Sequence, residues 1–188
     1  LVRYKGETIV KTPMDYNLAI EIAKDIISVP NCEVLLSGEK TAYKMQKTEE
    51  YLIRMTKVVQ YKTTIIKSLD EIQEDILKVS VCDLSGIANS EKYFADKWSD
   101  KAAAAVSGDQ YMDFMDLCVS KGDALKKVQK IYGIDRSECM AFGDNYNDCE
   151  MLKQAEFSYA MASAADDIKK NALYVTDSVE KILRGELL

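Results

Sequence analysis

The strongest constraint on the fold is a regular alternation of strand-like and helix-like segments from Leu117 to the end of the chain. Short apolar runs between polar turns predict the strands, and a 3.6-residue apolar periodicity predicts the helices. Strands that alternate with helices pair in parallel through right-handed crossovers, which predicts a layered α/β sheet. The predicted strands are residues 117–120, 139–142, 157–161 and 173–176, and the predicted helices are 122–132, 148–155, 165–172 and a final helix.

The residues before Leu117 follow a different order, in which hairpins separate the helices. This change predicts a domain boundary near residues 116–118. Turn residues predict hairpins around "KGE" (between strands 2–4 and 8–10), Ser37-Gly38-Glu39 and Ser107-Gly108-Asp109. The other predicted elements are a helix after Pro13 with the apolar stripe Leu18, Ile22, Ile26 and Val29, helices at 48–60, 69–77 and 90–99, and a strand at 76–83.

The chain contains no histidine, and this excludes several kinds of catalytic site. Ser-His-Asp triads, Cys-His pairs and histidine-ligated zinc all require the imidazole ring. Any chemistry must therefore use carboxylates, lysines, hydroxyls, thiols or a hard metal. The net charge of −6 and the dispersed lysines argue against a nucleic-acid partner.

The sequence also predicts a cytoplasmic protein without a membrane partner. No apolar run approaches the roughly 18 residues that a membrane helix needs. The first residues, "LVRYKGETIV", lack the basic start and apolar core of a signal peptide. The five cysteines form no C-x-x-C pair and are odd in number, which is typical of reduced thiols. Cys139 and Cys149 are therefore expected to be small buried apolar residues without a catalytic role.

The stretch "GDNYND", residues 143–148, joins the predicted strand 139–142 to the next helix. It places two carboxylates and two amides within five residues, Asp144 to Asp148. Oxygen groups of this kind are ligands for a hard cation such as Mg²⁺, which prefers near-octahedral coordination. The structural alternative is a polar turn in which Asn147 or Asp148 caps the helix.

Lys121 lies between a predicted strand end and a helix, in the stretch "VSKGDALKKV". One interpretation is purely structural: Ser120 caps the helix, Asp123 completes an S-x-x-D capping box, and Lys121 is solvated. However, the carboxyl ends of parallel strands meet at one edge of a sheet, and ligands bind there. We therefore expect Lys121 and the aspartates of "GDNYND" at the same edge, where they would form a site for an anion and Mg²⁺.

The stretches "SKGDALKKVQKIYGI", "CMAFGDNYNDCEML" and "YAM" resemble the last two motifs of the haloacid dehalogenase superfamily of hydrolases, in its Cof-type, sugar-phosphatase-like branch. The resemblance implies that Lys121 holds the transferring phosphoryl group and the nucleophilic carboxylate. It implies that Asp144 ligates Mg²⁺, that Asp148 supports the metal shell and that Asn147 contacts the phosphate. One departure is the turn at residues 161–164, which reads Met-Ala-Ser-Ala where the family usually has Met-Gly-Asn-Ala.

The resemblance extends to the order of the elements. Residues 13–116 resemble the large inserted α/β cap of the family, and residues 117–188 resemble the C-terminal part of its Rossmann-like, parallel-sheet core. Residues 1–12 then form a core or linker hairpin. The implied function is the Mg²⁺-dependent hydrolysis of a phosphomonoester, a sugar phosphate or a similar small phosphorylated metabolite, through an aspartyl-phosphate.

The family also has an early D-x-D-G-[TS] motif, whose first aspartate is the nucleophile and whose second is the acid/base, and this motif does not precede the predicted cap. The stretch "KVSVCDLSG" imitates it at Asp83, but a helix and a hairpin fill the 38 residues between Asp83 and Lys121. We therefore interpret Asp83 as an exposed residue at the end of a cap strand. The nucleophile is expected in a segment outside these residues, which would leave the chain as given inactive.

Two other functions stay open on this sequence. The chain could be a non-catalytic binding or interaction protein that keeps a decayed hydrolase scaffold. A phosphoacceptor receiver domain also uses Asp, Lys and Mg²⁺ at strand ends, but it has its acidic pair near the start of the domain and is less favoured.

The resemblance implies that strand 139–142 lies beside the strand that carries the nucleophile, so a core without that strand would leave one edge of 139–142 unpaired. Such an edge is a template for pairing with another chain. We expect a sheet of three or four strands whose 139–142 edge is covered by a second copy or by residues 1–10, with self-association through this edge.

Some polar and aromatic residues of the predicted cap carry weaker predictions. Asp113 and Asp116 are expected on opposite faces of a strand and at the surface. Tyr43, Tyr61 and Trp98 are candidates to line a substrate pocket, although packing within the cap explains them equally well.

Overall fold

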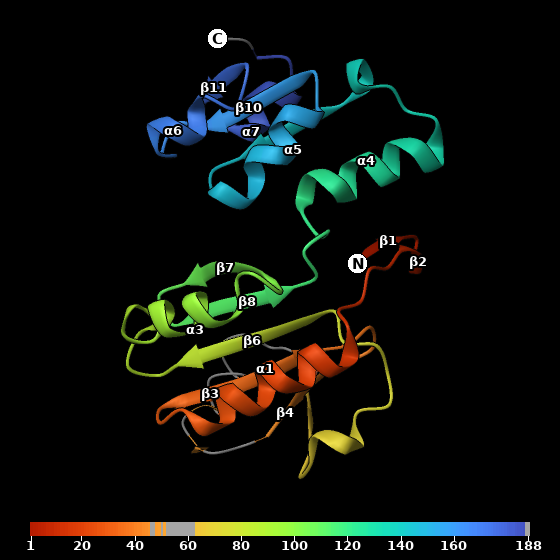
Figure 1. The fold of residues 1–188 in the computed structure, drawn as a ribbon. Helices are drawn as coiled ribbons and strands as arrows, with labels where there is room; N and C mark the ends of the chain where they lie inside the picture. Colours follow the sequence, from red (N-terminus) through yellow and green to blue (C-terminus); the bar gives the residue numbers. More distant parts are fainter. Residues whose placement is uncertain (46–47, 50, 52–62, 187–188) are drawn as a thin grey trace. The chain divides into compact units, whose positions relative to one another are not determined.

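The computed structural model of the protein describes residues 1–45, 48–49, 51 and 63–186, and the chain divides into two compact units (Figure 1). The first unit contains Leu1 and Lys11–Leu117, and the second contains Val2–Val10 and Cys118–Leu188. The predicted fold class, α/β with a parallel-strand sheet, is confirmed. No helix in the described ranges is long and apolar enough to cross a membrane.

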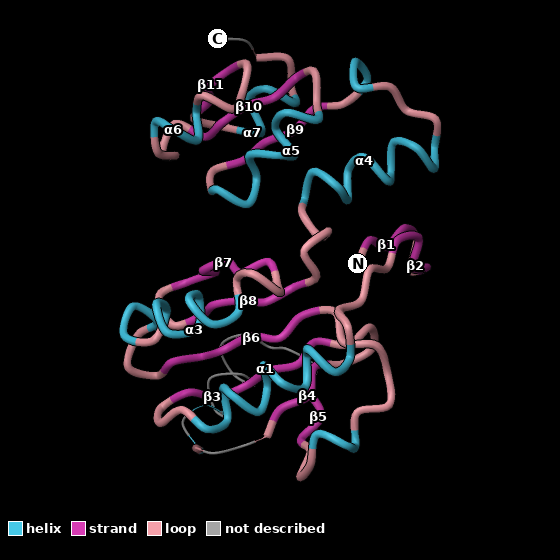
Figure 2. Tube along the Cα trace, in the orientation of Figure 1, coloured by secondary structure: helices cyan, strands magenta, loops and turns pink. Residues whose placement is uncertain are grey.

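The first unit is built on a six-stranded sheet with the order β5-β4-β3-β6-β8-β7 (Figure 2). Only β4 and β5 pair in parallel, and the other neighbours are antiparallel. The hairpins predicted around Gly38 and Gly108 are confirmed as β3–β4 and β7–β8. The strands are β3 (Cys32–Ser37), β4 (Ala42–Lys44), β5 (Thr63–Ile65), β6 (Lys78–Asp83), β7 (Ala103–Gly108) and β8 (Tyr111–Met115).

The helices α1 (Tyr16–Ser28) and α3 (Glu91–Trp98) form the core of this unit with the sheet. The Asp15 carboxylate caps α1 by accepting a hydrogen bond of 2.9 Å from the amide of Leu18. Burial of each large apolar side chain contributes about 1.5–3 kcal/mol, so this cluster is the main source of stability. Its members from these elements include Ile22, Ile26, Val34, Leu36, Val79, Val81, Phe94, Trp98, Met112 and Phe114.

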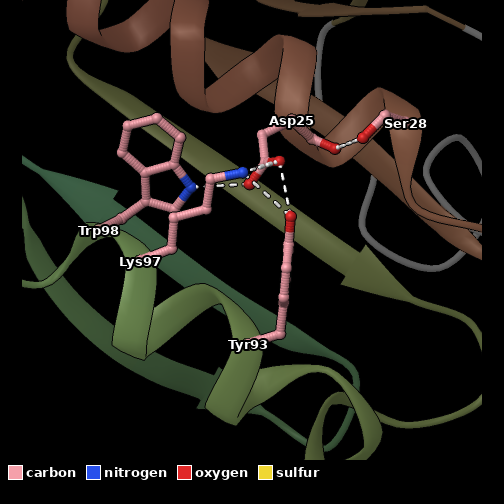
Figure 3. Close-up of polar contacts among 5 residues, drawn as sticks. All are labelled: Asp25, Ser28, Tyr93, Lys97 and Trp98. Carbon is pink, nitrogen blue, oxygen red and sulfur yellow. Dashed lines mark hydrogen bonds and ion pairs between the residues drawn. The ribbon is translucent and has the colours of Figure 1, made fainter.

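A polar cluster centred on Asp25 joins α1 to α3 (Figure 3). The carboxylate of Asp25 accepts hydrogen bonds from Tyr93 Oη (2.8 Å), Lys97 Nζ (2.5 Å) and Trp98 Nε1 (2.8 Å). Burial by itself raises the pKa of Asp25, but the three donors outweigh it and hold the pKa below its ordinary value. The ionised carboxylate thus fixes the position of one helix against the other.

The second unit contains a three-stranded parallel sheet with the order β11-β10-β9 and a separate hairpin, β1–β2. Phe142, Tyr159 and Tyr174 face one another across the three parallel strands, and their rings stack at 5.2 and 5.1 Å between centroids. The strands are β1 (Val2–Tyr4), β2 (Glu7–Val10), β9 (Met140–Gly143), β10 (Phe157–Met161) and β11 (Tyr174–Thr176), and the helices are α4 (Lys121–Tyr132), α5 (Cys149–Gln154), α6 (Asp166–Lys169) and α7 (Val179–Leu183).

Strand β9 is an edge of the sheet among the described residues, because it pairs only with β10. The predicted sheet of three or four strands is therefore confirmed, with three strands, and the strand predicted at 139–142 lies at its edge. The expectation that residues 1–10 cover this edge is wrong, since β1 and β2 pair with each other. Self-association through β9 stays a prediction.

Two predicted elements of the sequence analysis are wrong. Residues 117–120 form a turn and an extended segment, not a strand, and Leu117 is 58% exposed. Of the helix predicted at 69–77, only a 3-10 turn forms, at Leu69–Glu71. The backbone beyond it bonds to other segments, with Ile76 O accepting from Met14 N at 2.8 Å and Leu77 N donating to Ser37 O at 2.8 Å. The predicted helix 48–60 lies largely outside the described residues.

The predicted surface positions of Asp83 and Asp113 are also wrong, because both side chains are buried. Asp83 accepts hydrogen bonds from the hydroxyls of Ser85 (2.6 Å) and Ser90 (2.7 Å). Asp113 accepts one of 2.5 Å from the Ser80 hydroxyl and pairs with Lys78. Asp113 is buried because the neighbouring strand β6 supplies donors, and Asp83 because the segment that follows β6 supplies them, which alternation alone does not indicate.

Asp116 lies beyond the end of β8. The prediction that Asp113 and Asp116 lie on opposite faces of one strand therefore does not hold. Packing accounts for Trp98 in the Asp25 cluster and for Tyr43, whose hydroxyl donates to Glu74 at 2.7 Å. Tyr61 lies outside the described residues.

We expect Asp25→Asn to lower the free energy of unfolding of the first unit by about 2 kcal/mol, because it removes the charge that Tyr93, Lys97 and Trp98 share. Urea denaturation followed by the fluorescence of Trp98, the single tryptophan, measures this change. The matched control is Asp96→Asn, which breaks an exposed pair with Lys92 and should change stability by at most about 0.5 kcal/mol. Equal effects of the two substitutions would contradict the role of the Asp25 cluster.

Candidate active site

Lys121 is placed by the beginning of α4. The Ser120 hydroxyl accepts a hydrogen bond of 3.0 Å from the amide of Asp123, so the predicted cap is confirmed. The Asp123 carboxylate pairs with Lys127 at 2.6 Å. Gly122 allows α4 to approach α5 closely, since a Cβ at this position would lie 2.6 Å from the Cβ of Glu150. The helix start thus fixes the backbone of Lys121 against the element that follows β9.

The carboxylate of Asp148 joins the two predicted motifs. Asp148 is only 3% exposed, and its Oδ1 accepts a hydrogen bond from Lys121 Nζ, 27 residues earlier in the chain. Its Oδ2 accepts hydrogen bonds from the amides of Asp144 (3.0 Å) and Asn145 (3.2 Å). The structure therefore brings Lys121 and Asp148 together at the carboxyl end of β9, as the sequence predicts.

Burial by itself raises the pKa of Asp148. The Lys121 ammonium and the amides of Asp144 and Asn145 outweigh this effect, and the pKa lies below its ordinary value. The carboxylate is therefore ionised at neutral pH. Its negative charge holds an ammonium that is itself half exposed to solvent.

Gly143 is the last residue of β9, and it lies directly against Asp148. A Cβ on Gly143 would lie 2.5 Å from the Cβ of Asp148, closer than real side chains approach. Glycine is therefore required here for the backbone at the end of β9 to lie this close to the Asp148 side chain.

Asp144 and Asn147 are exposed at the top of the same loop. Within the described residues, the Asp144 carboxylate has neither a hydrogen bond nor an ion pair, so its oxygens are available to a ligand. Asp148 occupies the N-cap position of α5, as one predicted alternative has it, but its side chain makes no capping hydrogen bond to that helix. Asn145 caps the 3-10 turn Tyr146–Asp148: its side chain accepts from the amide of Tyr146 at 2.8 Å, and the Asp148 carboxylate completes a capping box.

Tyr146 and Asp167 form a contact that the sequence analysis missed. The Tyr146 hydroxyl donates a hydrogen bond of 2.9 Å to the Asp167 carboxylate, which raises the pKa of Tyr146. Asp167 belongs to α6, so the contact ties the "GDNYND" loop to the next strand-to-helix turn. The two residues are 21 positions apart, and the sequence offers no pattern that links them.

The residues at this edge fit part of a Mg²⁺ site. Asp144 offers carboxylate oxygens of the type that Mg²⁺ prefers. Both oxygens of Asp148 already accept hydrogen bonds, so direct ligation by Asp148 would require one of these bonds to be exchanged. The structure describes no group of three or more Cys, Asp or Glu side chains placed to hold a metal. Metal ligation by Asp144 and Asp148 stays a prediction.

Cys139 and Cys149, the two cysteines that flank the loop, belong to the second unit. Cys139 is buried in the apolar cluster of this unit, as predicted. Cys149 is only partly buried.

The second unit is thus an α/β structure that brings Lys121, Asp144 and Asp148 to the carboxyl end of a parallel strand, the usual position of a ligand in such folds. The family model of haloacid dehalogenase-like hydrolases matches residues 1–182. This chain belongs to that family.

Similar proteins include two curated phosphatases. The 5-amino-6-(5-phospho-D-ribitylamino)uracil phosphatase YbjI of Escherichia coli (strain K12) is 25% identical over 193 residues, which cover 97% of this chain and 71% of YbjI. The phosphatase YwtE of Bacillus subtilis (strain 168), named for the same substrate, is 27% identical over 188 residues, which cover 92% of this chain and 64% of YwtE. The chain thus spans about two thirds of the length of these relatives.

A solved structure is also similar. The crystal structure of SMU.1108c from Streptococcus mutans UA159 matches with a TM-score of 0.78 at 26% identity. The match covers 97% of this chain and 71% of the other chain.

We expect the amide NMR signals of Asp144 and Asn145 to shift together when Asp148 is protonated, with a midpoint below the ordinary aspartate value of about 3.9. Because the folded pKa is lowered, the stability that Asp148 contributes is complete above the unfolded pKa and is lost as the pH falls through the folded value. A titration from neutral to strongly acidic pH measures this midpoint. The Asp148→Asn variant should lack the transition, and a midpoint above the ordinary value would contradict the arrangement.

Gly143→Ala should displace Asp148 and destabilise the second unit by about 1–3 kcal/mol, because the added methyl group has no space. Urea denaturation measures the loss, and the amide signals of Asp144 and Asn145 report the displacement. In the control, Gly108→Ala, the added Cβ meets only Tyr111 at an ordinary 3.6 Å. Unchanged stability and unchanged amide signals in Gly143→Ala would show that Asp148 does not depend on this glycine.

Proposed function

We propose that this protein is a Mg²⁺-dependent phosphatase that hydrolyses small phosphomonoesters through an aspartyl-phosphate. The observation that carries the proposal is the joined arrangement of Lys121, Asp148 and Asp144 at the carboxyl end of β9. Family membership supports the hydrolase class, and the relatives that are named as phosphatases support the phosphate ester as the bond that is cleaved.

Lys121 is proposed to bind the phosphoryl oxygens. Its side chain is 51% exposed while its ammonium contacts the buried Asp148, so the charge is oriented without being covered. A fixed positive charge of this kind stabilises the negative charge on the transferring phosphoryl group. Asn147, exposed in the same loop, is proposed to donate its side-chain amide to a phosphate oxygen.

Asp144 is proposed to hold Mg²⁺ through its exposed carboxylate. When bound, Mg²⁺ would offset the phosphate charge and favour departure of the leaving oxygen. Asp148 is proposed to support this site mainly by fixing the backbone of Asp144, as its hydrogen bond to that amide indicates. Asp148 is also proposed to take part directly in the Mg²⁺ shell.

The nucleophile is proposed to come from a D-x-D-G-[TS] motif, which residues 1–188 do not contain. Asp83 cannot replace it, since its carboxylate is buried and accepts hydrogen bonds from Ser85 and Ser90. We therefore expect that residues 1–188 alone do not turn over a phosphomonoester. The first unit is proposed to be the cap that selects the leaving group, with residues 13–116 as its bounds.

The proposed substrate is a small phosphorylated metabolite of the sugar or polyol type. Support comes from the two relatives named for a phosphorylated ribitylaminouracil, which carries its phosphate on a polyol chain. A cytoplasmic location without nucleic-acid or membrane partners, and self-association through the β9 edge, complete the proposal.

We expect Asp144→Asn to lower kcat by at least about 100-fold in any form of the protein that turns over phosphomonoesters, because the amide is a poor ligand for Mg²⁺. Release of phosphate from p-nitrophenyl phosphate at varied Mg²⁺ concentration measures this loss. Asp177→Asn, which alters an exposed pair with Lys181, is the control and should keep its activity. Normal Mg²⁺-dependent turnover by Asp144→Asn would refute the assignment.

A further inference from the structure

Tyr146 is the most exposed aromatic residue in the part of the chain that the structure describes, at 65%. It stands in the same loop as Asp144 and Asn147, at the proposed phosphate site. A ring in solvent forgoes the stabilisation that burial would give it. The exposure of the Tyr146 ring beside the proposed phosphate site therefore calls for an explanation.

Hydrogen bonds hold Tyr146 at its backbone amide and at its hydroxyl. Its backbone amide donates to the Asn145 side chain at 2.8 Å, and its hydroxyl donates to Asp167 Oδ2 at 2.9 Å. Asp167 is itself fixed, because its Oδ1 accepts from the amide of Ile168 at 3.0 Å. A ligand that stacks on this ring would lose little additional side-chain freedom, since the ring is already ordered.

The competing explanation is that Tyr146 only braces the loop against α6. A brace depends on the hydroxyl that contacts Asp167 and does not depend on the face of the ring. The two roles therefore separate when the hydroxyl and the ring are removed in different variants.

We propose that Tyr146 is a specificity-determining residue, whose ring stacks on a planar, unsaturated group in the leaving part of a phosphate ester bound at Lys121 and Asp144. This inference rests on the proposed function. The Cα atoms of Asp144 and Tyr146 are at most about 7 Å apart, because only Asn145 lies between them. A small ester can therefore place its phosphate at one residue and a ring at the other. Aromatic stacking then adds to affinity beyond burial of area.

Two phosphonates that resist hydrolysis test this inference by binding alone. Benzylphosphonate and cyclohexylmethylphosphonate have the same charge and nearly the same size, and only the first has an aromatic ring. NMR titration of residues 1–188 in the presence of Mg²⁺ gives both dissociation constants. We expect benzylphosphonate to bind about fivefold more tightly.

Three variants then assign the preference. Tyr146→Leu should reduce the ratio of the two dissociation constants to about 1, since no ring remains to stack on. Tyr146→Phe keeps the ring and should keep the ratio. Tyr4→Leu removes another exposed tyrosine of the second unit, distant in sequence from the loop, and should also keep it. Thermal melting of each variant confirms that it is folded.

The outcomes test the role of Tyr146 separately from the proposed function. Equal binding of the two phosphonates to the unchanged protein, or a ratio that survives Tyr146→Leu, would overturn the inference and leave the phosphate site intact. Loss of the ratio in Tyr146→Phe would show that the hydroxyl brace is responsible and would overturn it too. Failure of both phosphonates and of inorganic phosphate to bind would contradict the binding of phosphate by Lys121 and Asn147, which is the part of the proposed function that lies within residues 1–188.

Discussion

A single buried carboxylate, that of Asp148, holds the candidate site together. One oxygen orients the ammonium of Lys121, and the other accepts the amides of Asp144 and Asn145. A buried charge is costly unless it is paired and hydrogen-bonded, and here every partner is a residue of the site. The helix start and the loop after β9 are therefore not independent, because each supplies a donor to the same buried charge.

Much of the fold follows from local pattern. Strand β10 has the predicted bounds, and α4 begins one residue earlier than predicted because the Ser120 cap includes Lys121 in the first turn. The error at residues 69–77 occurred where tertiary hydrogen bonds decided the outcome. The apolar spacing of Leu69, Ile72 and Ile76 suits a helix, but Ile72 is extended and all three side chains anchor a loop in the core. Apolar periodicity shows which side chains are buried. It does not show which groups form hydrogen bonds with the backbone.

The candidate site shows the same limit. Residue type and the position of "GDNYND" at a strand end were enough to predict that Lys121 and Asp148 lie together, although the strand predicted before Lys121 does not form. Spacing did not reveal that Asn145 caps the 3-10 turn, which depends on the local backbone of the loop. Nor did it reveal that Tyr146 reaches Asp167, which depends on how two loops lie in space. It also did not reveal why residue 143 must be glycine, which is a matter of the 2.5 Å approach to Asp148.

The apolar core of the second unit is small, and this has a consequence for how the protein opens. Its buried cluster consists of Cys139, Ala141, Leu152 and Ala155, whereas the first unit buries Ile22, Phe94, Phe114 and many others. Less buried apolar area means a lower free energy of local opening, so backbone hydrogen exchange is expected to be faster in the second unit. The candidate site lies there. A bound phosphate or cation would stabilise that unit through mass action, so ligand concentration would help set how much of it is folded.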